Sequence, residues 1–263
     1  MISAGIDVGT RFVKACIVKD EALLGCAIED VSRDIDRVIG RVYQKALDKA
    51  GISKRHVKRL VSTGYGAKLV KGKSFSMSCT HCVAKAAFVL DPEVRTVLDC
   101  GGLFITITSI DERGVFERTL SNDKCAAGSG KFLEMSAQAI EIPFSSISQY
   151  AERSKEPYLV SSNCAVFAES EVITQVNYGR ENTDIIAGVL KSIAGRAATL
   201  FERIQAQDKV ALAGGLATVT AFSSMFEQMT DRKTVSLPIP PQNLGAFGAG
   251  LMAQQGKPSR GGV

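Results

Sequence analysis

Three glycine-containing segments carry the residue types that bind phosphate groups. Two are Asp-x-Gly turns that each follow an apolar, strand-like run, Asp7-Val8-Gly9-Thr10 and Asp99-Cys100-Gly101-Gly102. The third is Ala213-Gly214-Gly215-Leu216-Ala217, which joins an apolar run to a helical pattern. Glycine lets backbone N–H groups approach a phosphate closely and adopts positive φ angles. A carboxylate at a strand end can hold Mg²⁺, usually through water.

These segments predict one nucleotide site. Asp7 and Asp99 are the expected catalytic carboxylates, and the glycine pair after residue 213 is a plausible seat for adenosine. The expected nucleotide-binding residues are Gly9, Thr10, Lys14, Gly101, Gly102, Gly214 and Gly215. A lone Asp-x-Gly turn is common in ordinary hairpins, so the prediction depends on three segments in order. The sequence has no G-x-x-x-x-G-K-[ST] motif, which excludes a P-loop, and no G-x-G-x-x-G after a strand.

Two cysteines stand just before predicted helices. Cys125 lies in the segment from Asn122 to Phe132, and Cys164 lies in the segment from Ser161 to Val172. The positive end of a helix dipole lowers the pKa of a thiol, and thiolates are ligands for iron–sulfur clusters. One chain supplies two such cysteines, whereas a cubane cluster needs about four. A two-fold dimer would supply all four ligands to one cluster.

The other cysteines have a simpler interpretation. The sequence holds seven cysteines, an odd number that argues against a disulfide framework. Cys79-Thr80-His81-Cys82 falls in a helical stretch, and no second C-x-x-C follows to complete a zinc site. We therefore expect Cys79 and Cys82 to be packing residues, and Cys100 to be a core residue.

The elements that position these residues repeat once along the chain. In the first half, strands are predicted at 2–7, 11–19, 22–29 and 57–63, and helices at 32–50 and 79–90. In the second half, strands are predicted at 94–100, 103–110, 113–120, 208–213 and 233–237, and helices at 128–140, 164–178, 183–205, 217–229 and 243–254. Each half opens with three strands, and an Asp-x-Gly turn follows the first of them. This pattern predicts a duplicated α/β fold.

Composition excludes several classes of protein. The 263 residues are 45% hydrophobic, which is enough for a sizeable core. The net charge is +5, tryptophan is absent and aromatic residues make up 6%, so nucleic acid is not an expected partner. No apolar run approaches the roughly 20 residues that span a bilayer, and no basic leader precedes the first strand. We expect a cytoplasmic protein.

The three glycine segments resemble the two phosphate motifs and the adenosine motif of the actin/hexokinase/heat-shock chaperone superfamily. That resemblance implies a duplicated, ribonuclease H-like fold of two domains with ATP in the cleft between them. The expected domains are residues 1–93 and 94–263, and the last helix is a candidate to pack back on the first domain.

The cysteine segments resemble the activator (archerase) component of 2-hydroxyacyl-CoA dehydratases and the related ATPase subunits of benzoyl-CoA reductase. The similarity covers nearly the whole chain, including Ser62 to Gly66, Asp184 to Gly188 and Leu244 to Ala249. It implies a homodimer with one [4Fe-4S] cluster bound by Cys125 and Cys164 of both chains. Turnover of ATP with Mg²⁺ would drive a low-potential electron, supplied by a ferredoxin or flavodoxin, into an iron–sulfur partner protein.

The chain departs from this family at the second turn. Family members usually continue it as Gly-Gly-Gln-Asp-x-Lys, whereas this sequence has Leu103, Phe104 and Thr106 at the three polar positions. We therefore expect slow hydrolysis without a partner. Two alternatives stay open: a nucleotide-sensing subunit with little hydrolysis, and a small-molecule kinase of the same superfamily. Glu169 and Glu171 are candidates to sense the nucleotide or contact the partner, and the electron acceptor is left open.

Overall fold

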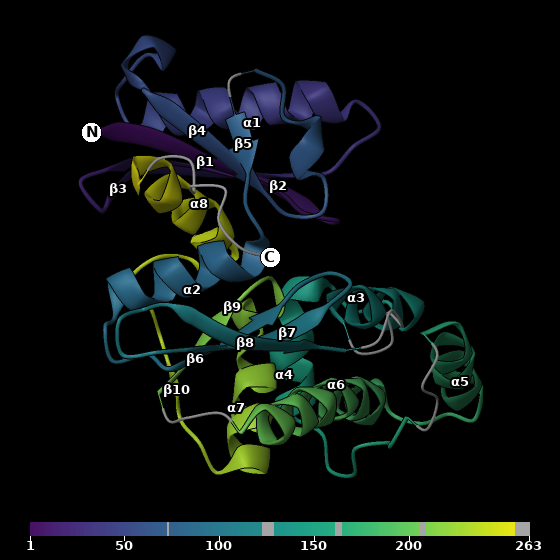
Figure 1. Ribbon diagram of the computed structural model, residues 1–263. Helices are drawn as coiled ribbons and strands as arrows, with labels where there is room; N and C mark the ends of the chain where they lie inside the picture. The colour runs from purple at the N-terminus through teal and green to yellow at the C-terminus, as the bar shows by residue number, and fades with distance from the viewer. Residues whose placement is uncertain (73, 123–128, 161–164, 206–208, 256–263) are drawn as a thin grey trace. The chain divides into compact units, whose positions relative to one another are not determined.

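The chain folds into two compact units, each built on one five-stranded mixed sheet (Figure 1). The computed structural model describes residues 1–72, 74–122, 129–160, 165–205 and 209–255. The first unit contains Met1–Val94, Ile110–Glu117 and the described residues from Leu237 on. The second contains Arg95–Ser109 and Arg118–Ser236. The helix near the end of the chain therefore belongs to the first unit.

The sheet of the first unit has the order β3-β2-β1-β4-β5. Its strands are β1 (Ile2–Val8), β2 (Phe12–Lys19), β3 (Ala22–Asp30), β4 (Arg59–Thr63) and β5 (Ser74–Ser76). The helices of this unit are α1 (Ile35–Lys49), α2 (Cys79–Leu90) and α8 (Leu244–Gln255). β2 pairs antiparallel with both β1 and β3. On the other side of β1, β4 pairs with it in parallel, and β5 pairs in parallel with β4.

The sheet of the second unit has the order β10-β9-β6-β7-β8. Its strands are β6 (Thr96–Cys100), β7 (Ile105–Ile110), β8 (Phe116–Ser121), β9 (Val210–Ala213) and β10 (Thr234–Val235). Its helices are α3 (Gly130–Ala139), α4 (Ile147–Glu152), α5 (Ala165–Asn177), α6 (Asn182–Ile204) and α7 (Thr220–Thr230). Short 3₁₀ turns lie at Lys54–His56, Ala67–Leu69, Phe144–Ser146, Leu216–Thr218 and Pro241–Asn243. Read from the other edge, the strand order matches the first sheet with every number raised by five, so the predicted duplication is confirmed.

The two faces of β1 carry different side chains because successive residues of a strand point in opposite directions. Ala4, Ile6 and Val8 face α1 and pack in one core with its buried residues Val38 and Val42. Asp34 caps the start of this helix, since its carboxylate accepts a hydrogen bond from the N–H of Arg37 at 3.2 Å. α1 therefore covers one face of the sheet, while α8 lies against the other (Figure 1).

The contact between α8 and the sheet depends on glycine. A Cβ on Gly5 would lie 1.9 Å from the carbonyl oxygen of Ala246, and one on Gly250 would lie 2.5 Å from Cγ2 of Val18. On another side of α8, a Cβ on Gly248 would lie 1.8 Å from the carbonyl oxygen of Cys82 in α2. Backbones approach so closely here that no side chain fits between them.

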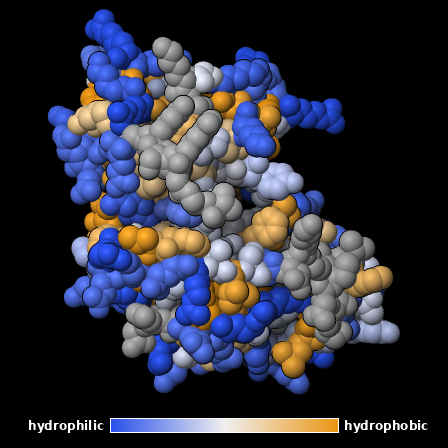
Figure 2. Space-filling view, viewed as in Figure 1, coloured by the Kyte–Doolittle hydropathy of each residue, from blue (hydrophilic) through white to orange (hydrophobic). Residues whose placement is uncertain are grey.

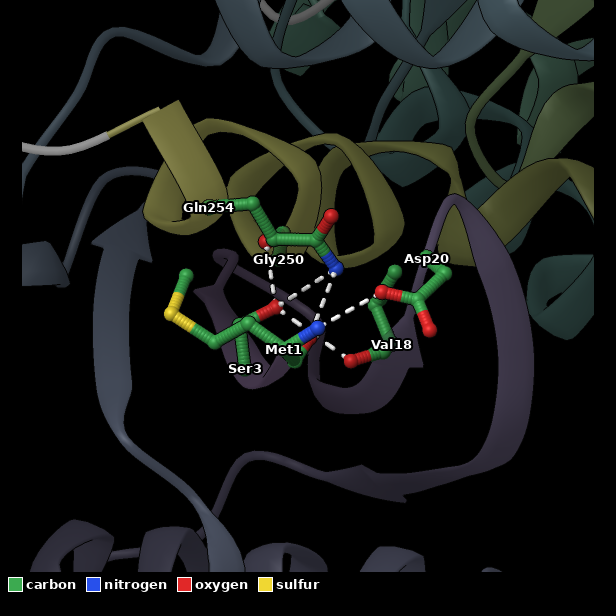
Figure 3. Close-up of polar contacts among 6 residues, drawn as sticks. All are labelled: Met1, Ser3, Val18, Asp20, Gly250 and Gln254. Carbon is green, nitrogen blue, oxygen red and sulfur yellow. Dashed lines mark hydrogen bonds and ion pairs between the residues drawn. The ribbon is translucent and has the colours of Figure 1, made fainter.

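Polar contacts fix the position of α8 along β1 (Figure 3). The hydroxyl of Ser3 donates to the carbonyl oxygen of Gly250 at 2.7 Å. The side-chain amide of Gln254 donates to the carbonyl oxygen of Met1 and to the hydroxyl of Ser3, both at 3.3 Å. The amino group of Met1 pairs with Asp20 at 2.6 Å. Because Ser3 is buried, a slip of α8 by one residue would leave its hydroxyl without this acceptor.

The second unit has one continuous core around α6. Phe132 of α3, Ile193 of α6 and Phe222 of α7 meet there beneath Leu98 and Ile107 of the sheet. The rings of Phe201 and Phe226 pack edge to face with their centroids 5.8 Å apart. None of the helices in the described ranges has the length and apolar character needed to span a bilayer.

Most predicted elements are present within a few residues of their expected bounds. The strand β5 and the helix α4 were not predicted. β5 has three residues, Ser74 to Ser76, and a run this short shows no period of its own. α4 has six residues and follows a proline-led turn, which the sequence pattern does not distinguish from a loop.

The close contact between α2 and α8 predicts an unusual response to a single methyl group. We expect Gly248→Ala to lower the free energy of unfolding by about 1–3 kcal/mol, because its Cβ would overlap the carbonyl oxygen of Cys82. Gly40 of α1 is the matched control, since a Cβ there has no neighbour within 4 Å among the described residues. Gly40→Ala should raise stability by about 0.5–1 kcal/mol through helix propensity. Equal effects of the two substitutions in urea-unfolding experiments would contradict the packing described here.

Candidate functional site

The first Asp-x-Gly turn places a carboxylate beside a lysine. Asp7 lies at the end of β1 and pairs in register with Lys14 of β2. The Nζ atom of Lys14 lies 2.9 Å from Oδ2 of Asp7, and both side chains are mostly buried. The N–H of Gly9 donates to the carbonyl oxygen of Phe12 at 3.0 Å, which closes the hairpin between them. The turn therefore holds an ion pair at its base.

Two glycines from distant parts of the chain leave room for the Asp7 carboxylate. Gly64 has a φ of +85°, and a Cβ on it would lie 2.2 Å from Oδ1 of Asp7. A Cβ on Gly245 in the first turn of α8 would lie 3.1 Å from Oδ2. The N–H of Gly66 donates to the carbonyl oxygen of Val8 at 2.8 Å and joins the two turns. A side chain at either glycine position would therefore occupy the space of the Asp7 carboxylate.

The second Asp-x-Gly turn repeats this geometry. Asp99 lies at the end of β6, and the N–H of Gly101 donates to the carbonyl oxygen of Phe104 at 2.8 Å. Gly214 follows β9 with a φ of +82°, and its Cβ would lie 2.6 Å from Oδ1 of Asp99. Gly214 therefore leaves room for the carboxylate of Asp99, as Gly64 does for that of Asp7. The two arrangements match because β9 lies next to β6 and β4 lies next to β1.

The carbonyl groups of the second turn bind the start of α3. The N–H of Gly130 donates to the carbonyl oxygen of Gly101 at 3.0 Å, and the N–H of Lys131 donates to that of Gly102 at 2.9 Å. Free N–H groups of the first helical turn normally need such partners. A displacement of this turn would therefore move the beginning of α3.

The two turns differ in charge. Lys14 stands opposite Asp7, whereas Thr106 stands at the matching register position opposite Asp99. The hydroxyl of Thr106 lies 3.4 Å from that of Ser121 in β8. Phe104 is 36% exposed, so an apolar ring stands beside the turn. The first turn keeps a cation next to its carboxylate, and the second turn has a neutral hydroxyl there.

The predicted nucleotide residues gather in each unit separately. The first turn brings Asp7, Gly9, Thr10 and Lys14 together, and the second brings Asp99, Gly101 and Gly102 beside Gly214 and Gly215. Among the described residues, nothing lies within 4 Å of a Cβ built on Gly215. Open space at this position is compatible with the predicted adenosine seat.

Sequence reasoning did not assign Gly64 and Gly245 to the site. The signal for Gly64 was available, because Thr63-Gly64 ends a buried strand as Ala213-Gly214 does in the second half. Gly245 offered no comparable signal, since it stands far along the chain in an apolar helix. Its role depends on α8 packing against the first sheet.

The two candidate cluster ligands, Cys125 and Cys164, lie outside the described residues. α5 begins at Ala165, directly after Cys164, as expected for a cysteine before a helix. In the part of the chain that the structure describes, no group of three or more His, Cys, Asp and Glu side chains could hold a metal ion. Cys82 is buried in α2, and burial raises the pKa of its thiol to about 12. Burial also raises the pKa of Cys100 well above its ordinary value, in keeping with a core residue.

α5 is anchored to α6 through Tyr158. The phenol of Tyr158 donates to Oε1 of Glu171 in α5 at 2.8 Å, and this hydrogen bond raises the pKa of the tyrosine. The guanidinium of Arg180 lies 5.0 Å from the centre of the same ring. The N–H of Tyr158 donates to the carbonyl oxygen of Asp184 at 2.9 Å. Glu171 therefore makes a contact within its own unit and holds the helix that follows Cys164.

Two neighbouring glycines should respond differently to substitution. Gly215 has a φ of −69°, so Gly215→Val should leave the free energy of unfolding within about 1 kcal/mol. If adenosine lies here, the same change should weaken ATP binding at least tenfold in calorimetry, because a branched side chain would occupy the seat. Gly214→Ala is the comparison: a methyl group at φ +82° and 2.3 Å from the carbonyl oxygen of Cys100 should destabilise the fold itself. Unchanged ATP affinity in a folded Gly215→Val protein would refute the adenosine assignment.

Proteins similar to this chain include dehydratase activators and a reductase subunit. The chain is 33% identical over 254 residues to a 2-hydroxyisocaproyl-CoA dehydratase activator of Clostridioides difficile, covering 96% of this chain and 95% of that one. It is 37% identical over 227 residues to a subunit of the benzoyl-CoA reductase of Thauera aromatica, covering 82% and 78% of the two chains.

Solved structures agree with this similarity. The activator of the 2-hydroxyisocaproyl-CoA dehydratase from Clostridium difficile, solved with bound ADPNP, superposes with a TM-score of 0.90 at 32% identity, covering 97% of this chain and 95% of that one. A glucokinase of the ROK family from Streptomyces griseus superposes at 0.62 with 12% identity, covering 97% and 100% of the two chains. The second likeness shows the actin/hexokinase-like fold alone.

A family model matches residues 4–253, which include both Asp-x-Gly turns and most of α8. Apart from the first two residues of β1 and the last two of α8, the match extends over both sheets and every described helix. By this match and by the relatives above, the chain belongs to the BadF/BadG/BcrA/BcrD ATPase family.

Proposed function

We propose that this protein is an ATP-driven activator that, as a homodimer in the cytoplasm, delivers low-potential electrons to an iron–sulfur enzyme. Its relatives include activators of 2-hydroxyacyl-CoA dehydratases and a benzoyl-CoA reductase subunit. The observation that carries the proposal is the pair of matching Asp-x-Gly turns within a chain of this ATPase family. The acceptor would be a dehydratase, an aromatic-CoA reductase or a double-cubane protein.

The two turns have the chemistry needed for Mg-ATP. Each offers a carboxylate, and each has a positive-φ glycine beside it that leaves room for that carboxylate. Exposed N–H groups of such turns bind phosphate oxygens, and Asp7 and Asp99 would hold Mg²⁺ through water. Lys14 would exchange part of its contact with Asp7 for a phosphate oxygen when the nucleotide is bound.

The proposed cluster ligands are Cys125 and Cys164 of two chains. A [4Fe-4S] cluster supplies one-electron chemistry at a potential set by hydrogen bonds and solvent exposure. The second phosphate turn binds the start of α3, and the segment that contains Cys125 precedes that helix. α5, which follows Cys164, is held to α6 by Tyr158 and Glu171. A nucleotide-dependent movement of the turn would therefore reach the cysteine segment through hydrogen bonds.

The surface of α5 supports the proposed homodimer. This helix buries Ala168 and Val172 against its unit but exposes Phe167 by 68%, with Ile173 and Val176 also exposed. Figure 2 shows apolar atoms at the surface in the area that α5 occupies in Figure 1. Apolar side chains on the helix that follows a cluster ligand suit a symmetric contact, in which the same patch of both chains is buried.

The second turn favours a slow ATPase over a fast one. Leu103 and Phe104 cannot orient a water molecule for attack on a phosphate, and Thr106 brings no charge to Asp99. A nucleotide-sensing subunit with little hydrolysis is the second candidate, and this turn is the observation that favours it. A small-molecule kinase would have to transfer phosphate and would need no iron.

Iron binding tests the cluster assignment. Replacement of Cys125 or Cys164 by Ala should abolish bound iron and visible absorption in protein purified without oxygen, because each dimer would lose two of its four ligands. The unaltered dimer should hold about four irons. Cys79→Ala is the matched control and should keep the cluster, because α2 places Cys79 in the first unit. A full cluster in the Cys125→Ala protein would disprove the assignment.

Basal hydrolysis tests the interpretation of the second turn. Leu103→Gln should raise the rate of ATP hydrolysis by the isolated protein about tenfold, because the amide could orient the attacking water. Leu24→Gln in β3 makes the same change on an exposed side chain away from the turns and should leave the rate unchanged. A fast rate in the unaltered protein would show that another group positions the water.

A further inference from the structure

Two thiols lie opposite each other on neighbouring strands of the first sheet. Cys16 of β2 and Cys26 of β3 are register partners in the antiparallel ladder. Directly opposite residues have Cα atoms about 4.5 or 5.5 Å apart, depending on the type of pair. Disulfides form over Cα separations of roughly 4.4–6.8 Å, so either type of pair is within reach.

Contacts with Asn243 show that both sulfur atoms point to the same side of the sheet. The thiol of Cys16 lies 3.8 Å from the carbonyl oxygen of Asn243 and donates to it. The side-chain amide of Asn243 donates to the sulfur of Cys26 at 3.2 Å. Gly25 points the other way, because a Cβ on it would lie 2.6 Å from the backbone nitrogen of Ala50, just after α1. One buried asparagine thus contacts both thiols on the α8 side.

We propose that Cys16 and Cys26 form a reversible cross-strand disulfide, and that this reaction changes how the start of α8 is held. Cys26 is partly exposed and would react first, whereas Cys16 is fully buried. A peroxide converts the Cys26 thiol to a sulfenic acid with release of one water. The sulfur of Cys16 then attacks the oxidised sulfur, a second water leaves, and two thiols and one peroxide have given one disulfide and two waters.

The disulfide would remove a hydrogen bond at the start of α8. A disulfide has no S–H, so the carbonyl oxygen of Asn243 would lose its donor on Cys16. In the described part of the chain the buried Oδ1 of Asn243 already has no hydrogen-bond partner, and the side-chain amide donates to the sulfur of Cys26. Asn243 ends the 3₁₀ turn Pro241–Asn243, and α8 begins at the next residue.

This change lies close to the first phosphate turn. Gly245, two residues after Asn243, packs against Oδ2 of Asp7. Gly5, the register partner of Cys16 on β1, packs against Ala246. A shift at the start of α8 would therefore alter the space around the Asp7 carboxylate. This last step rests on the proposed function, in which Asp7 takes part in binding Mg-ATP.

Peptide mapping tests the disulfide in the unaltered protein. The protein, purified without oxygen, is treated with increasing hydrogen peroxide, blocked with an alkylating agent and digested. We expect a linked peptide pair that joins Cys16 to Cys26 and is lost after dithiothreitol. If Cys26 is oxidised to higher acids or to a different partner while Cys16 is still alkylated, the proposal is wrong. If both thiols stay reduced while exposed methionines are oxidised, the proposal is also wrong.

Variants separate this pair from the other thiols. Cys26→Ser and Cys16→Ala should each abolish the linked peptide, and the first changes a partly exposed side chain with little risk to the core. Cys82→Ala should leave it intact, because Cys82 lies in α2. In the Cys16→Ala protein, Cys26 should be trapped as a sulfenic acid that a dimedone probe labels. Absence of that label would contradict the order of the reaction.

Calorimetry then tests the coupling. The linked protein should bind Mg-ATP about fivefold or more weakly than the reduced protein, and dithiothreitol should restore the affinity. Cys26→Ser treated with the same peroxide should show no change in affinity. A linked protein with unchanged affinity would refute the coupling, whereas a reduced protein that does not bind ATP would refute the proposed function instead.

Discussion

In each unit the position of an aspartate depends on a glycine with positive φ. The aspartate lies at the end of one strand, and the glycine directly follows the neighbouring strand. Gly64 and Gly214 have φ angles of +85° and +82°, and a Cβ on either would lie within 2.6 Å of a carboxylate oxygen. A side chain at either position would displace the aspartate and strain the backbone at the same time. The space that each glycine leaves is what allows a carboxylate to stand at the edge of a sheet, next to backbone N–H groups of the hairpin.

The two units share this geometry but differ in the charge around it. In the first, Lys14 stands opposite Asp7, and the first turn of α8 covers the carboxylate through Gly245. In the second, Thr106 stands opposite Asp99, and the turn gives its carbonyl groups to the start of α3. The first turn therefore keeps a cation beside its carboxylate. The second turn is joined by hydrogen bonds to a helix that follows a cysteine segment.

The sequence predicted much of this fold because its elements are long and regular. The repeated order of strands and helices, with an Asp-x-Gly turn after the first strand of each half, was sufficient to indicate the duplication. β5 was not predicted, since three residues carry no period. Gly245 and Asn243 could not be assigned, because Asp7 and Cys16, which they contact, are more than 200 residues away in the chain. The pairing of Cys16 with Cys26 needed the strand register, and an offset of one residue would have separated the two thiols.

The order of the segments has a consequence for biosynthesis. Strands β1 to β4 leave the ribosome early, yet the helix that covers one face of their sheet begins only at Leu244. At common rates of translation, roughly 10–30 s separate the end of α2 from the appearance of α8. Until α8 is made, the sheet face that carries Gly5, Val18 and the Cys16–Cys26 pair lacks the helix that covers it, although every strand of the second unit precedes Leu244 in the chain. The nascent chain thus completes its N-terminal unit last, and its thiol pair is most accessible before synthesis ends.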